Sequence, residues 1–194
     1  MKTKKILALA LAAVLLVAVT VAGTIAYLTA VTDEVTNTFT AAGIEIKLDE
    51  AKVGTDGKKL TGDAAERVKA NSYRMIPGNV YDKDPTVTVV GDAENVDVYL
   101  FVKFEEGNAA TYLTYTFNAE GWTQVPGETN VWYRAVSAST NDQSWVLLEP
   151  ATITVKDTVT QDNMAAAAAV SLKFDAWAVQ KDNLTVEAAW AQVK

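Results

Sequence analysis

Residues 96–104 form the run that most restricts what this chain can fold into. Apolar and polar side chains alternate along it with the period of two that is typical of an extended strand. A strand over these residues would present one face with Val98, Leu100, Val102 and Phe104 and the other with Tyr99, Phe101 and Lys103. This run is the strongest strand signal in the chain.

Shorter runs of the same kind recur along the chain, separated by turn signals such as Pro77-Gly78 and Pro126-Gly127. The predicted strands cover residues 44–48, 86–90, 110–117, 121–124, 131–136, 145–148, 151–155 and 170–180. One helix is predicted over residues 186–193, with Asn183 or Thr185 as its cap and with Val186, Ala189, Trp190 and Val193 on one apolar stripe. This pattern predicts an all-β fold, an antiparallel jelly-roll-like β-sandwich with a short C-terminal helix.

The N-terminus has the composition of a secretory signal peptide. Lys2, Lys4 and Lys5 precede a run of 27 uncharged residues, 6–32. Small residues at positions 24 and 26 favour cleavage between Ala26 and Tyr27, and cleavage after Ala30 is the alternative. A retained N-terminal hydrophobic helix stays open as well, because about 20 apolar residues suffice to cross a bilayer.

These boundaries divide the chain into three parts. Residues 1–26 are expected to form the signal peptide, residues 27–39 an N-terminal linker, and residues 40–194 the β-sandwich domain. The domain is long enough to bury a substantial core.

The composition excludes several classes of chemistry. The chain contains no Cys and no His, so disulfides, thiol catalysis, Ser-His-Asp triads and His-ligated zinc are all absent. Its net charge of −7 becomes about −10 when the three lysines of the leader are removed. An acidic chain is a poor partner for phosphate groups, so we expect no binding of nucleic acid and contact with a membrane only through an uncleaved leader.

Oxygen ligands offer the one remaining route to a metal site. The pairs Asp49-Glu50, Asp82 with Asp84, and Asp92 with Glu94 could hold a hard cation such as calcium. None of them has the spacing of an EF-hand loop. Since most acidic residues serve as a solvated surface, we predict no metal, no cofactor and no enzymatic activity.

The tryptophans admit two interpretations. Trp132, Trp177 and Trp190 are expected in the core, whereas Trp122, next to the turn at Pro126, is the one that could be exposed and stack on a sugar. The core interpretation is favoured for all four.

Several motifs, taken together, resemble those of a known family. The segments Gly23-Thr-Ile-Ala-Tyr-Leu-Thr and Asn37-Thr-Phe-Thr-Ala-Ala-Gly-Ile-Glu-Ile-Lys-Leu48 are similar to the start of the TasA/camelysin family. The central blocks 83–89 and 97–103 resemble clostridial-type members, as do the endings at residues 176–180 and 188–190. Together these motifs span nearly the whole chain, and their order and spacing carry the resemblance.

The resemblance implies a secreted structural subunit of biofilm extracellular-matrix fibres, released by the dedicated signal peptidase SipW. It also implies that the freed N-terminal segment of one subunit adds as a donor strand to the sandwich of the next. The donor-strand residues would be Tyr27, Leu28, Val31, Val35 and Phe39. The implied partners are further copies of the chain in a head-to-tail polymer, the signal peptidase acting on the precursor, and other matrix proteins. The metalloprotease activity described for camelysin is not carried over, because this chain lacks His.

Three alternatives remain at this stage. The chain could be a membrane-anchored cell-surface adhesin, a hydrolase that uses two carboxylates, or a secreted β-sandwich without an assigned role. A retained leader would favour the adhesin, and two carboxylates that converge in a pocket would favour the hydrolase.

Overall fold

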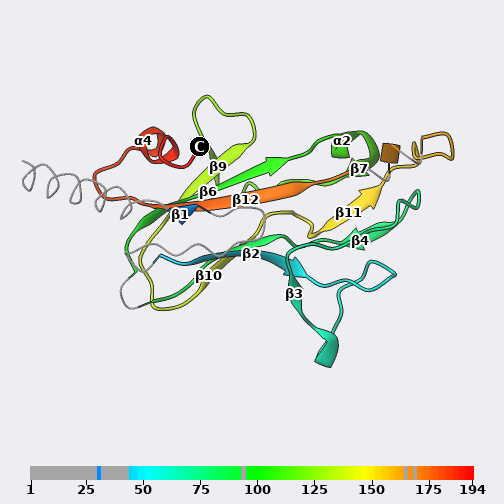
Figure 1. Cartoon of the computed structure of the whole chain (residues 1–194), viewed down its shortest axis with the longest axis horizontal. Coiled ribbons are helices and arrows are strands. Elements are labelled where there is room, and N and C mark those ends of the chain that lie inside the picture. The colour runs from blue at the N-terminus through cyan, green and yellow to red at the C-terminus, as the bar shows by residue number, and fades with distance from the viewer. Residues whose placement is uncertain (1–29, 32–43, 93–94, 164–165, 168–169) are drawn as a thin grey trace, which may run out of the picture.

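The computed structural model describes residues 30–31, 44–92, 95–163, 166–167 and 170–194, and its regular elements are mainly short antiparallel strands (Figure 1). The predicted all-β class is confirmed. The predicted N-terminal hydrophobic helix and the boundaries at residues 26 and 39 lie outside the described residues.

The largest sheet has five strands in the order β1-β12-β6-β9-β8. Its strands are β1 (Ala30–Val31), β12 (Lys173–Gln180), β6 (Val98–Glu105), β9 (Val131–Val136) and β8 (Thr123–Gln124). The strand predicted over residues 96–104 is confirmed as β6, which lies in the middle of the sheet, pairs with β12 along its whole length, and buries both of its faces.

The second sheet has four strands in the order β10-β5-β2-β3. Its strands are β10 (Gln143–Val146), β5 (Thr86–Val89), β2 (Ile46–Ala51) and β3 (Arg67–Val68). Residues 44 and 46 are buried, as predicted for one side of this strand. The strand continues past the predicted end at residue 48 because residues 50 and 51 pair with β3.

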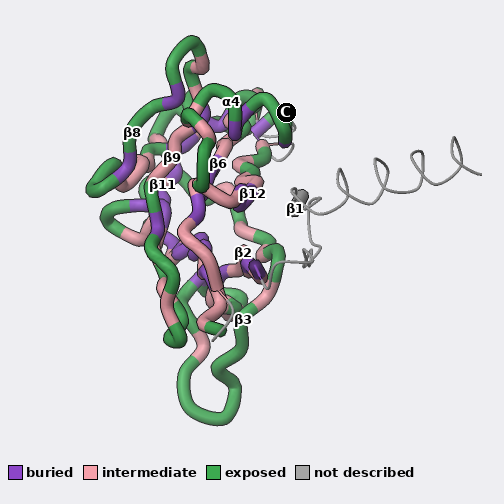
Figure 2. The backbone as a smooth tube through the Cα atoms, turned by 90° about the vertical axis from the view of Figure 1, so that its left-hand side faces the viewer, coloured by how far each residue is buried: buried purple, intermediate pink, exposed green. Residues whose placement is uncertain are grey.

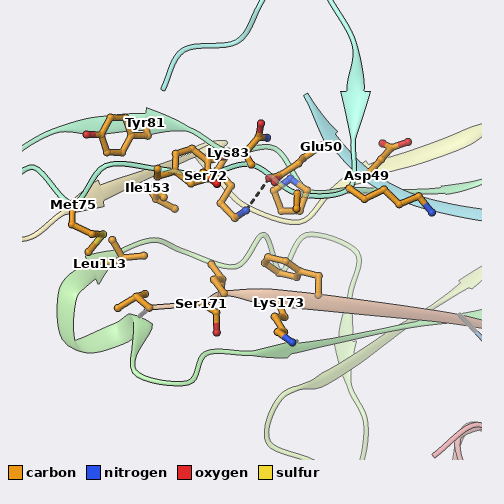
Figure 3. Close-up of a pocket in the computed structure, with 18 of the residues that line it drawn as sticks. Asp49, Glu50, Ser72, Met75, Tyr81, Lys83, Leu113, Ile153, Ser171 and Lys173 are labelled. Atoms are coloured by element: carbon orange, nitrogen blue, oxygen red, sulfur yellow. Dashed lines mark hydrogen bonds and ion pairs between the residues drawn. The ribbon is translucent and has the colours of Figure 1, made fainter. Parts of the chain in front are cut away.

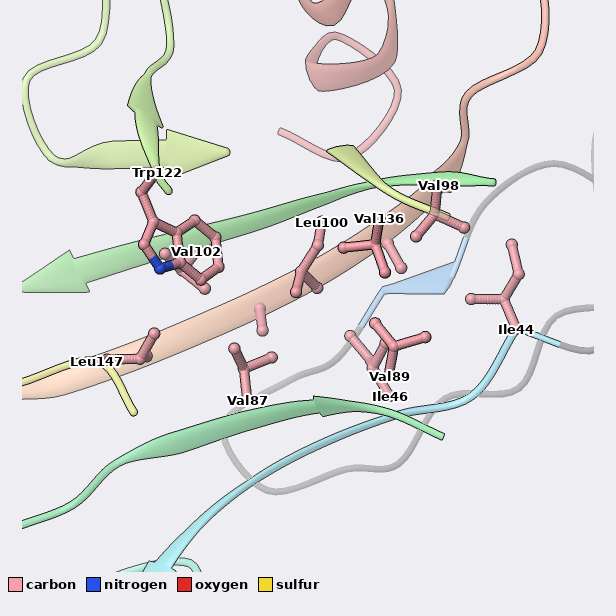
Figure 4. Packing of buried hydrophobic residues seen from close by; sticks show 12 residues of the cluster. Ile44, Ile46, Val87, Val89, Val98, Leu100, Val102, Trp122, Val136 and Leu147 are labelled. Carbon is pink, nitrogen blue, oxygen red and sulfur yellow. The ribbon is translucent and has the colours of Figure 1, made fainter. Parts of the chain in front are cut away.

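These two sheets face each other and enclose the main core. Figure 4 shows Val87, Val89 and Ile46 of the four-stranded sheet pointing toward Leu100 and Val98 of the five-stranded sheet. All five side chains are at most 4% exposed. Sheet-on-sheet packing of this kind is the arrangement that a strand-rich chain with few helices was expected to adopt.

A third sheet extends the molecule at one end. It has the order β4-β11-β7 and consists of β4 (Val80–Asp82), β11 (Thr152–Val155) and β7 (Leu113–Thr114). Its own buried cluster includes Tyr81, Leu113 and Ile153. The predicted strand over residues 110–117 is only partly right, because its first residues form the short helix α2 (Ala109–Tyr112).

The segment between β2 and residue 71 projects from the body as an exposed segment that carries β3 (Figure 2). It contains a single 3-10 turn, η1 (Gly62–Ala64), whose cap residue Thr61 makes no side-chain capping hydrogen bond.

The C-terminal helix α4 (Val186–Trp190) covers the outer face of the five-stranded sheet. Thr185 is its cap, as predicted, and accepts a hydrogen bond from the Ala188 amide. The predicted apolar stripe is confirmed at Ala189, Trp190 and Val193, which pack on Phe101 and its neighbours.

Candidate functional site

The outer edge of β12 is the place where the N-terminal segment meets the sheet. One side of β12 pairs with β6 over all eight residues. On the other side, Ala30 lies opposite Ala178 and Val31 lies opposite Trp177, in antiparallel register. An extended segment can therefore join this sheet by main-chain hydrogen bonding at β12.

The outer face of β12 is held by aromatic packing. The Trp177 ring meets the Trp190 ring at 5.5 Å between centroids, in a T-shaped arrangement. The Trp190 indole nitrogen donates a hydrogen bond of 2.8 Å to Glu128 Oε1, which ties α4 to the turn before β9. Aromatic pairs of this geometry contribute beyond their buried area, so α4 fixes the strand whose edge receives β1.

The inner face of β12 is built from small side chains. Ala176 and Ala178 are fully buried in the main core, and β12 packs directly on β2 of the facing sheet. Without a bulky side chain at these two positions the sheets approach closely at this edge. The acceptor strand is thus fixed from both faces.

Some of the predicted site residues lie in the part of the chain that the structure describes, and others do not. Val31 and the alternative cleavage residue Ala30 lie in β1. Ala26, Tyr27, Leu28, Val35 and Phe39 lie outside the described residues. Trp177 and Ala178, the partners of β1, were not identified from the sequence, because no local pattern shows which strand a distant segment will join.

Two of the acidic pairs considered for calcium, Asp49-Glu50 and Asp82 with Asp84, are engaged by basic side chains, whereas Glu94 of the third lies outside the described residues. The Asp84 carboxylate accepts a 2.7 Å hydrogen bond from the Ala51 amide and lies 2.9 Å from Lys59 Nζ and 3.3 Å from Arg67 Nη1. Burial acts to raise the pKa of Asp84, but the Ala51 hydrogen bond and the two cations outweigh it and hold the pKa below its usual value.

The adjacent pair is occupied in the same way. Glu50 accepts a 2.8 Å hydrogen bond from Lys83 Nζ, and Asp49 accepts from Arg67. Across the part of the chain that the structure describes, no three His, Cys, Asp or Glu side chains are placed to hold a metal ion. Asp49 and Glu50 do line one cavity, yet each faces a cation, which suits a structural ion pair better than an acid–base pair.

Trp122 is buried, with 7% of its surface exposed, so the sugar-stacking alternative for this residue is wrong. Its ring packs in the main core, near the guanidinium of Arg134. The same guanidinium lies 4.3 Å from the centre of the Trp145 ring. The core positions predicted for Trp177 and Trp190 are confirmed, and Trp132 is partly buried against the main core.

The stacked Arg134 was not anticipated, because a charged residue in a strand is expected to face solvent. Burial lowers the pKa of Arg134 from its ordinary value, while the charge of Glu120 acts in the opposite direction. Its Nε and Nη1 groups find no hydrogen-bond acceptor among the described residues. The two aromatic faces are therefore its main stabilising contacts.

In the described ranges, no helix is both long and apolar enough to pass through a lipid bilayer. No protein-family model, curated protein or solved structure matches the chain.

Proposed function

We propose that this protein is a secreted structural subunit of extracellular-matrix fibres that assembles by N-terminal strand addition after cleavage of its leader. Cleavage between Ala26 and Tyr27 would leave β1 intact, whereas cleavage after Ala30 would remove half of it. The jelly-roll-like sandwich of residues 40–194 would be the folded body of each subunit, and residues 27–39 the donated strand.

The observation that carries the proposal is the pairing of β1 with β12. It places part of the predicted donor segment, Ala30–Val31, in antiparallel register at an outer sheet edge of its own chain. The same edge of a second copy offers the same hydrogen-bonding groups. Exchange of an identical segment between copies, head to tail, does not close on itself and therefore extends into a filament.

The spacing of the donor residues fits this register. Tyr27, Val31, Val35 and Phe39 are separated by even intervals, so an extended donor strand would present them on one face. With residue 31 opposite Trp177, that face is the one on which α4 packs. Leu28 would lie on the other face, toward the interior of the sandwich.

In this proposal, cleavage of the leader determines when assembly can begin. In the precursor, Ala26 joins the apolar leader only four residues before β1, so the segment cannot reach a second subunit while the leader is in the membrane. After cleavage, docking within one chain still competes with donation, because a tethered strand has a high effective concentration. We therefore expect fibre formation to depend steeply on protein concentration.

The test compares two purified chains by electron microscopy and sedimentation. Residues 27–194 are expected to form fibres, and residues 40–194 are expected to remain monomeric. Fibres of equal number from residues 40–194, or none from residues 27–194 at high concentration, would contradict the proposal.

A point variant separates strand pairing from the length of the segment. Val31→Pro removes a main-chain N–H and is disfavoured within a paired strand, so it should prevent fibres. Val31→Thr is the matched control, because it keeps the β-branched shape and the N–H, and it should assemble normally.

A further inference from the structure

A cavity of about 710 Å³ lies between two walls of the fold, beyond the end of the main core (Figure 3). One wall is formed by the end of β2, residues 69–75 and β11. The opposite wall is formed by Leu113 and residues 170–175. Trp177 and Ala178, the partners of β1, do not line it, although Lys173, Phe174 and Asp175 of the same strand, β12, do.

The volume of the cavity falls within the range of ligand pockets, roughly 300–1,000 Å³. Much of the lining is apolar, including Met75, Leu113, Ile153 and Leu172. Ordered water is poorly stabilised against such an apolar lining, because a bound water molecule needs several polar hydrogen-bond partners.

The lining changes character from one end to the other. In Figure 3, Met75, Leu113 and Tyr81 lie toward one end, and Asp49, Glu50 and Lys173 lie toward the other. A ligand that matches this gradient has an apolar body and a polar head group.

The charges at the polar end balance. Among the described residues, the cavity is lined by three lysines, Lys69, Lys83 and Lys173, and by three acids, Asp49, Glu50 and Asp175. A head group with a single net charge would therefore meet as many like charges as opposite ones.

The ion pair between Glu50 and Lys83 adds to the preference for a head group of zero net charge. Lys83 Nζ lies 2.8 Å from Glu50 Oε2, with side chains 10% and 7% exposed, and 5.4 Å from the centre of the Tyr73 ring. A buried charge is costly when its partner is drawn away. A head group that carries both charges, or none, can approach the pair without leaving either member uncompensated.

We propose that this cavity binds a single-chain amphiphile of zero net charge, with its alkyl chain toward Met75 and Leu113 and a zwitterionic head group at Glu50 and Lys83. This inference does not depend on fibre formation, because the lining residues belong to a single chain.

The experiment uses the chain of residues 27–194 and three probes with the same twelve-carbon chain, each below its micellar concentration. The probes are dodecylphosphocholine, dodecanoate and dodecyltrimethylammonium, and binding is measured by titration calorimetry. We expect saturable binding of one dodecylphosphocholine per chain, about tenfold or more tighter than either singly charged probe. Absence of saturable binding, or equal binding of all three probes, would overturn the proposal.

Variants locate the binding. Val170→Trp places a large ring in the cavity and should abolish binding of dodecylphosphocholine, whereas Val80→Trp adds the same ring at an exposed position that does not line the cavity and should leave binding unchanged. Met75→Trp obstructs the same end and is a second blocking variant if Val170→Trp does not fold, which near-UV circular dichroism reports. Binding that persists in a folded blocking variant would place the ligand elsewhere.

The head-group claim has its own variant. Glu50→Gln combined with Lys83→Met removes both charges at similar volume. It should retain binding of the alkyl chain and lose the preference for the zwitterion. An unchanged preference in this double variant would contradict the role of the ion pair.

Discussion

Ala30 lies directly opposite Ala178, in the register that makes β1 the outermost strand of the five-stranded sheet. Because β12 gives its other edge to β6, this pairing is where the N-terminal segment becomes part of the sheet. The same pairing, made between two copies, would link them. The proposed function therefore depends on whether residue 30 of one chain can meet residue 178 of another.

The docking of α4 should contribute strongly to stability. Trp190 is 6% exposed, packs on Trp177 and Phe101, and donates to Glu128. Trp190→Ala is expected to lower the free energy of unfolding by about 3–5 kcal/mol, as for other large core truncations, measured by urea denaturation. Gln192→Ala, at an exposed position of the same segment, should change it by less than about 0.5 kcal/mol. Equal effects of the two substitutions would show that α4 is not packed as described.

Two glycines with similar backbone conformations provide a matched pair. A Cβ on Gly57 (φ +73°) would lie 2.1 Å from Tyr81 Cδ1, and Tyr81 is buried in the core of the third sheet. A Cβ on Gly62 (φ +63°) would meet nothing within 4 Å. Gly57→Ala should therefore cost about 3 kcal/mol or more in unfolding free energy, and Gly62→Ala only the backbone cost of about 1–2 kcal/mol. Thermal unfolding of both variants checks the difference.

The contribution of Asp84 should depend on pH with a defined sign. Its pKa is lower in the folded chain than in the unfolded chain, so its ionic stabilisation is complete above the unfolded value of about 4 and is lost as the pH falls through the folded value. Asp84→Asn should destabilise by about 2 kcal/mol at neutral pH and by progressively less below about pH 4. Urea unfolding across this range measures the change, with the exposed Asp63→Asn as control. A cost that is independent of pH would mean that the cations near Asp84 do not act on its charge.

Arg134 should be more important for its shape than for its charge. Arg134→Met keeps a long side chain between Trp122 and Trp145 and removes two N–H groups that have no acceptor among the described residues. The cation–π contribution lost and the desolvation cost removed are of similar size, so the net change should stay within about 1 kcal/mol. Arg134→Ala leaves a void between the rings and should cost about 2–4 kcal/mol. A larger loss for Met than for Ala would contradict this interpretation.

The sequence predicted the elements better than their partners. The alternation of residues 96–104 identified the strand β6, and the cap at Thr185 with the stripe at residues 189, 190 and 193 identified α4, because each signal is local. Which edge meets residues 30–31 depends on long-range pairing, which no local pattern encodes. The helix at 109–112 was missed because four residues are too few to show a helical period, and tertiary contacts decide their conformation.

The same distinction applies to the sites. The acidic pairs form ion pairs with basic residues that are distant in the sequence: Asp84 with Lys59 and Arg67, and Glu50 with Lys83. Composition alone could not show these ion pairs. The favoured core position of Trp122 is confirmed, because packing against Phe117 and Trp145 buries the ring, and the exposure suggested by the neighbouring Pro126-Gly127 turn is wrong.

The most direct test of strand donation uses a disulfide between residues 30 and 178. The natural chain has no Cys, so Ala30→Cys with Ala178→Cys creates a single defined pair, and directly opposed strand positions suit a disulfide. The chain of residues 27–194 with both substitutions is incubated under fibre-forming conditions, oxidised, and run on a non-reducing denaturing gel, with each single variant as control. The account predicts a ladder of covalent multimers, because residue 30 of each subunit meets residue 178 of the next. A single band of internally bridged monomer, from a sample that electron microscopy shows to be fibrous, would contradict it.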